Sequence, residues 1–298
     1  MAVTVTERPV ERVAEQIEEQ SWIDSVAVPL QRPIFAFLER RPDLRTLLDG
    51  TWLGHPVHPA ITDLAVGSWA AGFVLDLLDL VGINRGLRRG TDALQAIGLV
   101  GALGSAVTGI SDWSYTGGGA RRLGFVHGIM NTAIAGLYAA SLVARARGNR
   151  TRGIALSSLG YGMLLFSSWL GGELSYRCGI GVNHTAFQAG PREFVPVLAD
   201  AALGEGQRRR VVAAGMPVLL VRYQGRVYAH GETCPHLGGP LSEGPMLDGT
   251  IVCPWHGSRF QVVDGQVVAG PATVSLPRFD VRVCEGQIEV RRVDPGCA

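Results

Sequence analysis

Two short segments in the last third of this 298-residue chain hold the residues best suited to chemistry. The first is CPHLGG at residues 234–239, and the second is CPWHGS at residues 253–258. Together they offer two thiolates and two imidazoles, a set that could bind one tetrahedral zinc ion. Each segment, however, supplies one Cys and one His. This order favours a site with two irons, in which both thiolates bind one iron and both imidazoles bind the other.

The surrounding region, residues 192–292, resembles a Rieske iron–sulfur domain. Sixteen residues separate His236 from Cys253, as in that family, and the segment GPA at 270–272, followed by Leu276 and Phe279, resembles the proline loop that covers the cluster. Neutral imidazole ligands leave the oxidised site less negative than four thiolates would, which raises its reduction potential. The resemblance implies a [2Fe–2S] cluster held by Cys234, His236, Cys253 and His256. We expect the two His to be the exit for the electron.

Some departures from the family pattern bear on the reduction potential. Quinol-oxidising Rieske proteins pair one extra Cys from each loop, and those positions here are Gly239 and Trp255. The same proteins carry a Ser and a Tyr that donate hydrogen bonds to sulfur; Ser258 matches the Ser, whereas Phe260 stands in place of the Tyr. Losing a donor leaves the charge of the reduced cluster less stabilised. The loops therefore resemble those of ferredoxins from oxygenase systems, and we expect a low-to-intermediate potential.

A complete Rieske oxygenase also needs a mononuclear iron held by two His and a carboxylate. Besides the predicted ligands, only His230 remains after residue 192, and we interpret it as an ordinary His at a strand end. We therefore expect an electron-transfer protein rather than a complete enzyme, working with redox partner proteins as donor and acceptor. The remaining cysteines, Cys178, Cys284 and Cys297, lack partner spacing and are predicted to be unligated thiols.

The elements that position these loops are predicted to be short strands. β-rich runs lie at residues 217–223, 226–230, 259–263, 280–284 and 287–291. Gly-containing turns separate several of them, as expected for antiparallel hairpins. This pattern indicates an all-β domain of about 100 residues.

The middle of the chain is more apolar than the β-rich region. Residues 93–110, 123–144 and 153–172 carry no charge, and residues 60–81 are equally apolar except for three Asp. Each run is long enough to cross a hydrocarbon core of roughly 30 Å as a helix. The alternative, a buried bundle in a water-soluble protein, is less favoured because four successive runs of this length are rare there. Gly101, Ser105 and Gly109 recur every four residues, which allows close helix packing in lipid. Asp76 and Asp79 are interpreted as interfacial acids at a helix end.

Residues 54–185 resemble an uncharacterised bacterial family of four-helix membrane proteins, carried by the segment GHPVHP at 54–59. With four spans, one membrane face receives the start of the first and third helices and the end of the second and fourth. A second, speculative site follows on that face: His55, His58, His127 and His184. Such a group could bind haem, a metal or quinol. Helix capping and loop hydrogen bonds are the favoured role for any one of them.

Charge and composition exclude some classes of protein. Basic and acidic residues number 27 and 26, and hydrophobic residues make up 47% of the chain. Near-neutrality argues against a nucleic-acid binder, and the apolar content argues against disorder. The first fifty residues show no secretory signal. Their apolar positions instead predict a helix with one apolar face near residues 7–20 and a surface-lying stretch at 33–38, or short helices that cap the bundle.

Orientation rests on conflicting signals. Arg-rich connections at 82–90 and 145–152 would put the opposite face, with the cluster, outside the cell. The lack of an N-terminal twin-arginine signal argues against export of a loaded cluster, and we favour a cytoplasmic cluster.

The sequence thus predicts an α + β chain of two domains, a four-transmembrane-helix bundle followed by an all-β Rieske domain, in the cell membrane. The predicted organisation is a cap at 1–53, spans within 54–176, a linker at 177–191, the Rieske domain at 192–293 and a tail at 294–298. The predicted function is membrane-anchored one-electron transfer. The alternative is a subunit or the whole of a quinol- or haem-linked membrane oxidoreductase that uses the His-rich face.

Overall fold

The computed structural model describes residues 9–83 and 85–293. The chain divides into two compact units, one made of residues 1–37 and 57–180 and the other of residues 38–56 and 181–298. The polypeptide therefore passes between the units three times. Residues 38–56, which precede the apolar spans in the sequence, belong to the unit that contains the strands.

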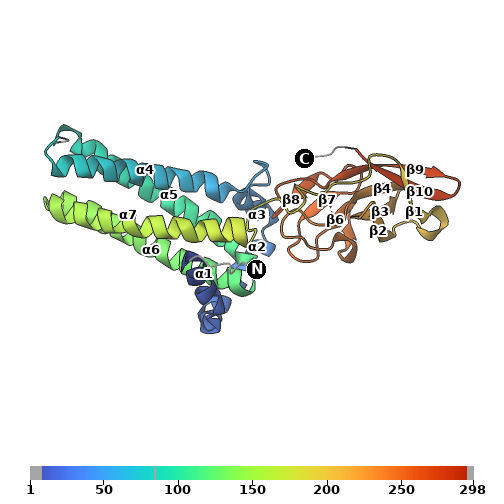
Figure 1. The fold of residues 1–298 in the computed structure, drawn as a ribbon, viewed down its shortest axis with the longest axis horizontal. Coiled ribbons are helices and arrows are strands. Elements are labelled where there is room, and N and C mark those ends of the chain that lie inside the picture. The colour runs from blue at the N-terminus through green and yellow to red at the C-terminus, as the bar shows by residue number, and fades with distance from the viewer. Residues whose placement is uncertain (1–8, 84, 294–298) are drawn as a thin grey trace, which may run out of the picture. The chain divides into compact units, whose positions relative to one another are not determined.

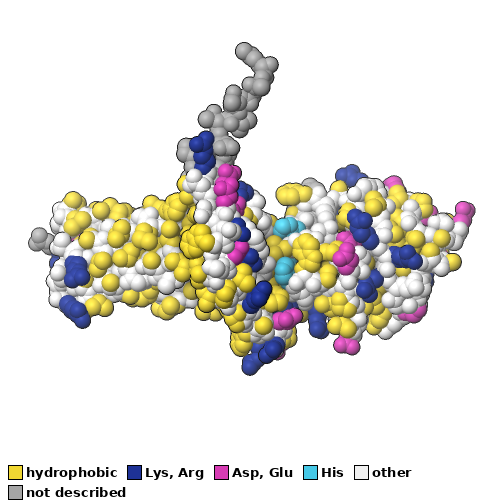
Figure 2. Space-filling model, turned by 90° about the horizontal axis from the view of Figure 1, so that it is seen from below, with side chains coloured by type: hydrophobic (Ala, Val, Ile, Leu, Met, Phe, Trp, Pro, Cys, Tyr) yellow, Lys and Arg dark blue, Asp and Glu magenta, His cyan; other side chains and the backbone are white. Residues whose placement is uncertain are grey.

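Four long helices form the first unit: α4 (Val57–Leu80), α5 (Arg88–Ser114), α6 (Gly118–Ala146) and α7 (Arg150–Gly172). All are long and apolar enough to cross a membrane. They lie alongside one another in Figure 1, joined by short connections. Large apolar side chains cover the outside of the bundle, as Figure 2 shows; Val100 is 66% exposed and Leu103 is 61% exposed. The four predicted spans are confirmed, and an apolar exterior of this kind suits lipid.

Small residues set the contact between α4 and α5, as their spacing predicts. A Cβ added to Gly101 would lie 2.9 Å from the backbone nitrogen of Ala65, and one added to Gly109 would lie 2.7 Å from the imidazole of His58. No side chain larger than hydrogen fits at either position without a shift. The two backbones therefore approach closely, which is the usual mode of helix packing in a membrane.

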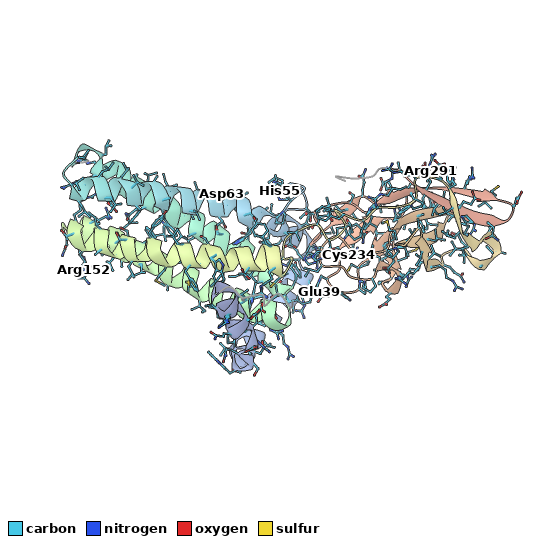
Figure 3. All side chains as sticks on the ribbon, viewed as in Figure 1. Glu39, His55, Asp63, Arg152, Cys234 and Arg291 are labelled. Atoms are coloured by element: carbon cyan, nitrogen blue, oxygen red, sulfur yellow. The ribbon has the colours of Figure 1, made fainter. Side chains whose placement is uncertain are left out.

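One end of the bundle contains a buried network of charges. Asp76 is fully buried and accepts hydrogen bonds from Arg145 (2.5 Å), Gln95 (2.9 Å) and Ser157 (3.1 Å). Asp79 pairs with Arg150 at 2.6 Å and with Arg88 at 2.8 Å. Arg152, labelled in Figure 3, marks this end. Asp76 and Asp79 lie near the C-terminal end of α4, as expected from the sequence, but both side chains are buried, and arginines from neighbouring helices neutralise them.

Three shorter helices come first in the chain: α1 (Pro9–Glu19), α2 (Asp24–Glu39) and α3 (Pro42–Asp49). Ala14 of α1 is fully buried against Leu123 of α6 and Leu170 of α7, so α1 covers the bundle with its apolar face. Asp24, at the start of α2, binds Arg121 at 3.0 Å and Arg122 at 2.6 Å. These contacts place α1 and the start of α2 against the bundle, as capping helices would lie, whereas α3 belongs to the unit that contains the strands. The surface-lying stretch at 33–38 stays a prediction.

The second unit contains two antiparallel sheets. The larger has the order β1-β10-β9-β4-β3-β2 and the smaller the order β5-β6-β7-β8. The larger sheet consists of β1 (Val195–Ala199), β2 (Arg208–Ala213), β3 (Met216–Tyr223), β4 (Arg226–Gly231), β9 (Arg278–Cys284) and β10 (Gln287–Arg292). The smaller consists of β5 (Met246–Leu247), β6 (Thr250–Val252), β7 (Arg259–Gln261) and β8 (Val267–Ala269). All five predicted strands are present, as β3, β4, β7, β9 and β10.

Strand β3 has a hydrophobic core on each face. Leu219 and Val221 pack into one core, and the alternate residues Val218 and Leu220 pack into the other. This is the two-residue period expected of a strand buried on both sides. The core of Leu219 and Val221 also contains the two cysteines of the CPHLGG and CPWHGS segments, so these loops are anchored in packed hydrophobic surroundings.

Candidate metal centre

The two chemistry-bearing segments form loops with the same backbone hydrogen bonds. In the first loop the Cys234 N–H donates to the Gly239 carbonyl at 2.9 Å, and the Gly238 N–H donates back to the Cys234 carbonyl at 2.9 Å. In the second, between β6 and β7, Cys253 and Ser258 make the equivalent bond at 2.8 Å, and Gly257 donates to the Cys253 carbonyl at 3.0 Å. The fourth residue after each Cys has positive φ, 81° and 72°, which explains why glycine occupies both positions.

The loops bring like side chains together. The thiols of Cys234 and Cys253 lie within hydrogen-bonding distance of each other and are free, with 1% and 3% of each residue exposed. The rings of His236 and His256 lie 5.1 Å apart between centroids, nearly perpendicular at 87°. Figure 3 labels Cys234 in the β-rich unit. The site therefore has a thiol pair and an imidazole pair, each with one member from each loop.

This donor set fits a binuclear iron–sulfur centre. Such a centre takes two protein ligands for each iron, whereas a structural zinc takes four around one ion. Within residues 9–83 and 85–293, no three His, Cys, Asp or Glu side chains are placed to hold a single metal ion. The pairing of thiol with thiol and imidazole with imidazole matches the two-plus-two requirement.

The surroundings set the protonation of these side chains. The hydrogen bond between the thiols lowers the pKa of Cys253 to about 7 and raises the pKa of Cys234 far above its usual value, because their shared proton stays on Cys234. Burial lowers the pKa of His256 to about 4, and the positive charge of Arg45 adds to this. Burial likewise holds the pKa of His236 well below its usual value. Both imidazoles are thus neutral at pH 7, as metal ligands must be.

Residues next to the thiols occupy the positions expected from the sequence. Ser258 is fully buried, hydrogen-bonds to the Cys234 thiol and accepts a bond from the Ala272 N–H at 2.9 Å. Phe260 is fully buried in the adjoining core and offers no hydroxyl. A Cβ on Gly239 would lie 2.8 Å from the Cys253 sulfur, so this loop leaves no room for a further side chain there. Trp255 is 53% exposed.

The segment Gly270-Pro271-Ala272 forms a loop, here called the covering loop, beside these residues. Ala272 is 1% exposed and belongs to the same core as both cysteines. Its N–H bond to Ser258 ties the covering loop to the second cysteine loop. This arrangement agrees with the role expected from the resemblance.

His230, the other His of the β region, is a core residue of β4. It is 2% exposed, and its Nε2 lies 2.7 Å from the Val262 carbonyl oxygen. Burial lowers its pKa, which favours the neutral imidazole. Its place in a strand agrees with the structural role expected from the sequence.

The speculative second site is divided between the units. His58 and His127 belong to the helical unit, and His55 and His184 belong to the other. His58 Nδ1 lies 2.8 Å from the Ser105 carbonyl oxygen, and His127 Nδ1 lies 3.0 Å from that of Ser167. Both are hydrogen bonds between neighbouring helices, whereas the sequence favoured helix capping and loop hydrogen bonds for individual histidines. A shared haem, metal or quinol site at the four residues stays a prediction.

Sequence reasoning missed two contributors to the metal centre. The backbone N–H of His184 donates to the Pro235 carbonyl at 3.0 Å, which fixes the first cysteine loop. Arg45 of α3 donates to the carbonyl of Gly257, the residue after His256, at 3.1 Å. Arg45 lies more than two hundred positions from this partner, and no local pattern marks such a contact.

Comparison with known proteins agrees with this geometry. The Rieske [2Fe-2S] domain family matches residues 193–280, and the family described as predicted membrane protein (DUF2231) matches residues 54–184. Ferredoxin CarAc of Metapseudomonas resinovorans is 37% identical over 98 residues, which cover 33% of this chain and 92% of the ferredoxin. Apoptosis-inducing factor 3 of Homo sapiens is 38% identical over 89 residues, 30% of this chain, but the chain spans only 15% of that protein.

Among solved structures, the ferredoxin of carbazole 1,9a-dioxygenase from Nocardioides aromaticivorans IC177 is 30% identical, with a TM-score of 0.32. The match covers 33% of this chain and 97% of that ferredoxin. The Rieske family match and the similarity to ferredoxin CarAc indicate a [2Fe–2S] cofactor and an electron-transfer role. The apolar helices together with the membrane-family match indicate a multi-pass membrane protein. The chain therefore belongs to the Rieske [2Fe-2S] family through its C-terminal β domain, and it carries a DUF2231 membrane domain ahead of it.

Proposed function

We propose that this protein is a membrane-anchored one-electron carrier, in which Cys234 and Cys253 bind one iron and His236 and His256 bind the other. The observation that carries the proposal is the repeated loop, whose matching hydrogen bonds pair the two thiols and pair the two imidazoles. When bound, a [2Fe–2S] cluster of this kind takes up and releases one electron, with a potential raised by its His ligands.

The chain's own residues would hold the cluster, shield its thiol ligands from water and orient them. Burial of Cys234 and Cys253 excludes water from the thiol side, and the Ser258 hydroxyl supports the Cys234 sulfur with a hydrogen bond. The imidazoles are less buried than the thiols, and Trp255 is exposed beside His256. This asymmetry supports an electron exit on the imidazole side, where a partner protein would come closest to the cluster.

A low-to-intermediate reduction potential is part of the proposal. Gly239 has no room for the extra Cys of quinol-oxidising proteins, and Phe260 provides no hydroxyl to sulfur. Fewer donors leave the reduced form less stabilised. The similarity to ferredoxins whose names place them in dioxygenase systems, those of naphthalene 1,2-dioxygenase and anthranilate 1,2-dioxygenase, supports an oxygenase or reductase protein as the redox partner.

The test uses the full chain, purified anaerobically in detergent. We expect iron and acid-labile sulfide in equal amounts, and the EPR signal of a reduced Rieske centre after chemical reduction. Cys253→Ser should abolish both the labile sulfide and the signal, whereas Cys284→Ser, which removes an exposed thiol on β9, should change neither. Zinc as the sole metal would overturn the proposal. Haem absorption in the same preparation would instead support the quinol- or haem-linked oxidoreductase.

We further propose that the cluster faces the cytoplasm. The two described cysteines outside the proposed ligand set, Cys178 and Cys284, are free, and Cys284 is exposed. Persistent free thiols are typical of a reducing compartment. The test labels Cys284 with a membrane-impermeant maleimide in a Cys178→Ser, Cys297→Ser background. Labelling is expected only after the cells are permeabilised, and equal labelling of intact cells would place the β domain outside.

A further inference from the structure

Helix α3 (Pro42–Asp49) and the residues just after it pack on the loops of the candidate metal centre, although they precede these loops by about two hundred positions. They belong to the same compact unit as the β strands, and Figure 1 shows α3 beside β8. Three side chains of the segment make hydrogen bonds to the loops: Arg45, Thr46 and Thr51. Residues 42–51 are called the strap below.

Arg45 connects two loops through a single nitrogen. Its Nη2 donates to the Gly257 carbonyl at 3.1 Å and to the Gly270 carbonyl at 2.5 Å. Gly257 directly follows His256, and Gly270 begins the covering loop. The residue is 5% exposed, so these contacts are shielded from water. One buried cation therefore links the backbone beside an imidazole ligand to the loop that covers the thiols.

The covering loop is shaped to receive the strap. The Thr51 hydroxyl donates to the Ala272 carbonyl at 2.9 Å, and the Gly270 N–H donates to the Thr46 hydroxyl at 3.3 Å. A Cβ on Gly270 would lie 2.6 Å from the Thr51 hydroxyl oxygen, so only glycine allows this approach. The strap thus holds both ends of the covering loop, and the N–H of Ala272 at one end also binds the Ser258 hydroxyl.

The charge of Arg45 is held by neutral groups. Its hydrogen bonds among the described residues go to carbonyl oxygens, and its Nε makes none. Asp49, 2% exposed, lies one turn further along α3 on the side of Gly270. Arg45 contacts the second cysteine loop at Gly257, next to His256, as well as the covering loop, so its positive charge lies beside the backbone of a His ligand. A guanidinium stays protonated at every working pH.

We propose that the strap is a built-in tuning element, in which Arg45 fixes the covering loop on the second cysteine loop and raises the reduction potential of the cluster. The inference rests on the proposed function, because it needs the cluster to be bound. Reduction adds a negative charge, and a nearby buried cation favours that state. In an effective dielectric of about 20, one such charge at the edge of the ligand loops changes the equilibrium constant for reduction on the order of tenfold.

The experiment compares four variants of the full chain with the parent, all in detergent, by redox titration followed by EPR. Arg45→Met and Arg45→Gln remove the charge, and Arg45→Lys keeps it. Arg40→Met, which removes an exposed charge just before the strap, is the matched control. Both neutral variants should reduce the equilibrium constant about tenfold, which for a one-electron couple is about 59 mV. Arg45→Lys should stay within about twofold of the parent, and Arg40→Met should not differ.

The outcomes separate the two proposals. A parent chain without the EPR signal would refute the proposed function itself. A neutral variant that retains the cluster with an unchanged potential would refute only the role of Arg45. If both neutral variants lose the cluster while Arg45→Lys retains it at the parent potential, Arg45 acts in folding alone and the tuning proposal is overturned. A potential that falls in Arg40→Met as far as in Arg45→Met would also overturn it.

Discussion

Replacing Ser258 with alanine tests the chemistry of the thiol side. Ser258 is fully buried, its hydroxyl hydrogen-bonds to the Cys234 sulfur, and its oxygen accepts the Ala272 N–H at 2.9 Å. Ser258→Ala removes both bonds and adds no bulk. The reduced cluster carries more negative charge on sulfur than the oxidised one, so the lost bond matters more in the reduced state.

The expected size follows from the two bonds. Hydrogen bonds to charged groups contribute about 1.5–3 kcal/mol to stability, and if about half of that distinguishes the two redox states the loss is about 1.5 kcal/mol at most. This corresponds to about a tenfold change in the equilibrium constant, or about 59 mV downward for one electron. Ser258→Ala also leaves the buried Ala272 N–H without its acceptor. This should lower the folding stability by about 1–3 kcal/mol in both the oxidised and the reduced protein.

Redox titration by EPR measures the change in reduction potential. Thermal unfolding of the oxidised protein measures the loss of folding stability. Ser275→Ala is the control, because the Ser275 hydroxyl also accepts a backbone N–H, at 3.2 Å from Val267, but in an exposed place. It should leave the potential unchanged. A Ser258→Ala protein with a full cluster and the parent potential would refute the reasoning about the thiol side.

Three further predictions concern other parts of the chain. Gly239→Ala places a Cβ 2.8 Å from the Cys253 sulfur; we expect lower iron content and about 1–3 kcal/mol less stability, and a normal iron content would contradict the close contact. Asp76→Asn breaks the buried pair with Arg145 and should destabilise the helical unit by about 3–5 kcal/mol in thermal unfolding in detergent, whereas the exposed Asp63→Asn should not. The arginine partners of Asp24 lower its pKa from 3.8 to about 2; its stabilisation is therefore complete above about pH 4 and lost as the pH falls towards 2. The melting temperatures of the parent and Asp24→Asn should differ at pH 5 and converge near pH 2.

The parts that the sequence predicted well are those that a short window contains. Eighteen or more uncharged residues in succession mark a span, and alternating β-rich runs between Gly turns mark strands such as β3 and β4. The paired loops were predictable for the same reason, since Cys234 and His236 stand two positions apart and the glycine at position 238 is needed for its positive φ. The spacing of residues within a short window is therefore enough to predict the spans, the strands and the paired loops.

The parts that the sequence did not predict depend on partners far along the chain. Asp76 looks like a helix-end acid, but its partners Gln95, Arg145 and Ser157 come from three other helices. A hydropathy sum counts each charge by itself and cannot register a neutralising partner. The strap was missed for the same reason: α3 is a short helix of eight residues, and nothing within it shows that Arg45 binds loops of the β unit.

The buried arginines of the two units differ in a way that leads to one more prediction. Arg145 is neutralised by Asp76, whereas Arg45 is bound by carbonyl oxygens. A buried cation without a bound carboxylate costs stability until a negative charge arrives nearby. Because coupling between two equilibria is reciprocal, an Arg45 that favours reduction tenfold requires reduction to favour the docked strap tenfold. Amide hydrogen exchange in residues 42–51 should therefore slow on reduction of the parent chain and not of Arg45→Met. Equal exchange in both redox states of the parent, with the cluster intact, would show that the cation and the electron do not interact.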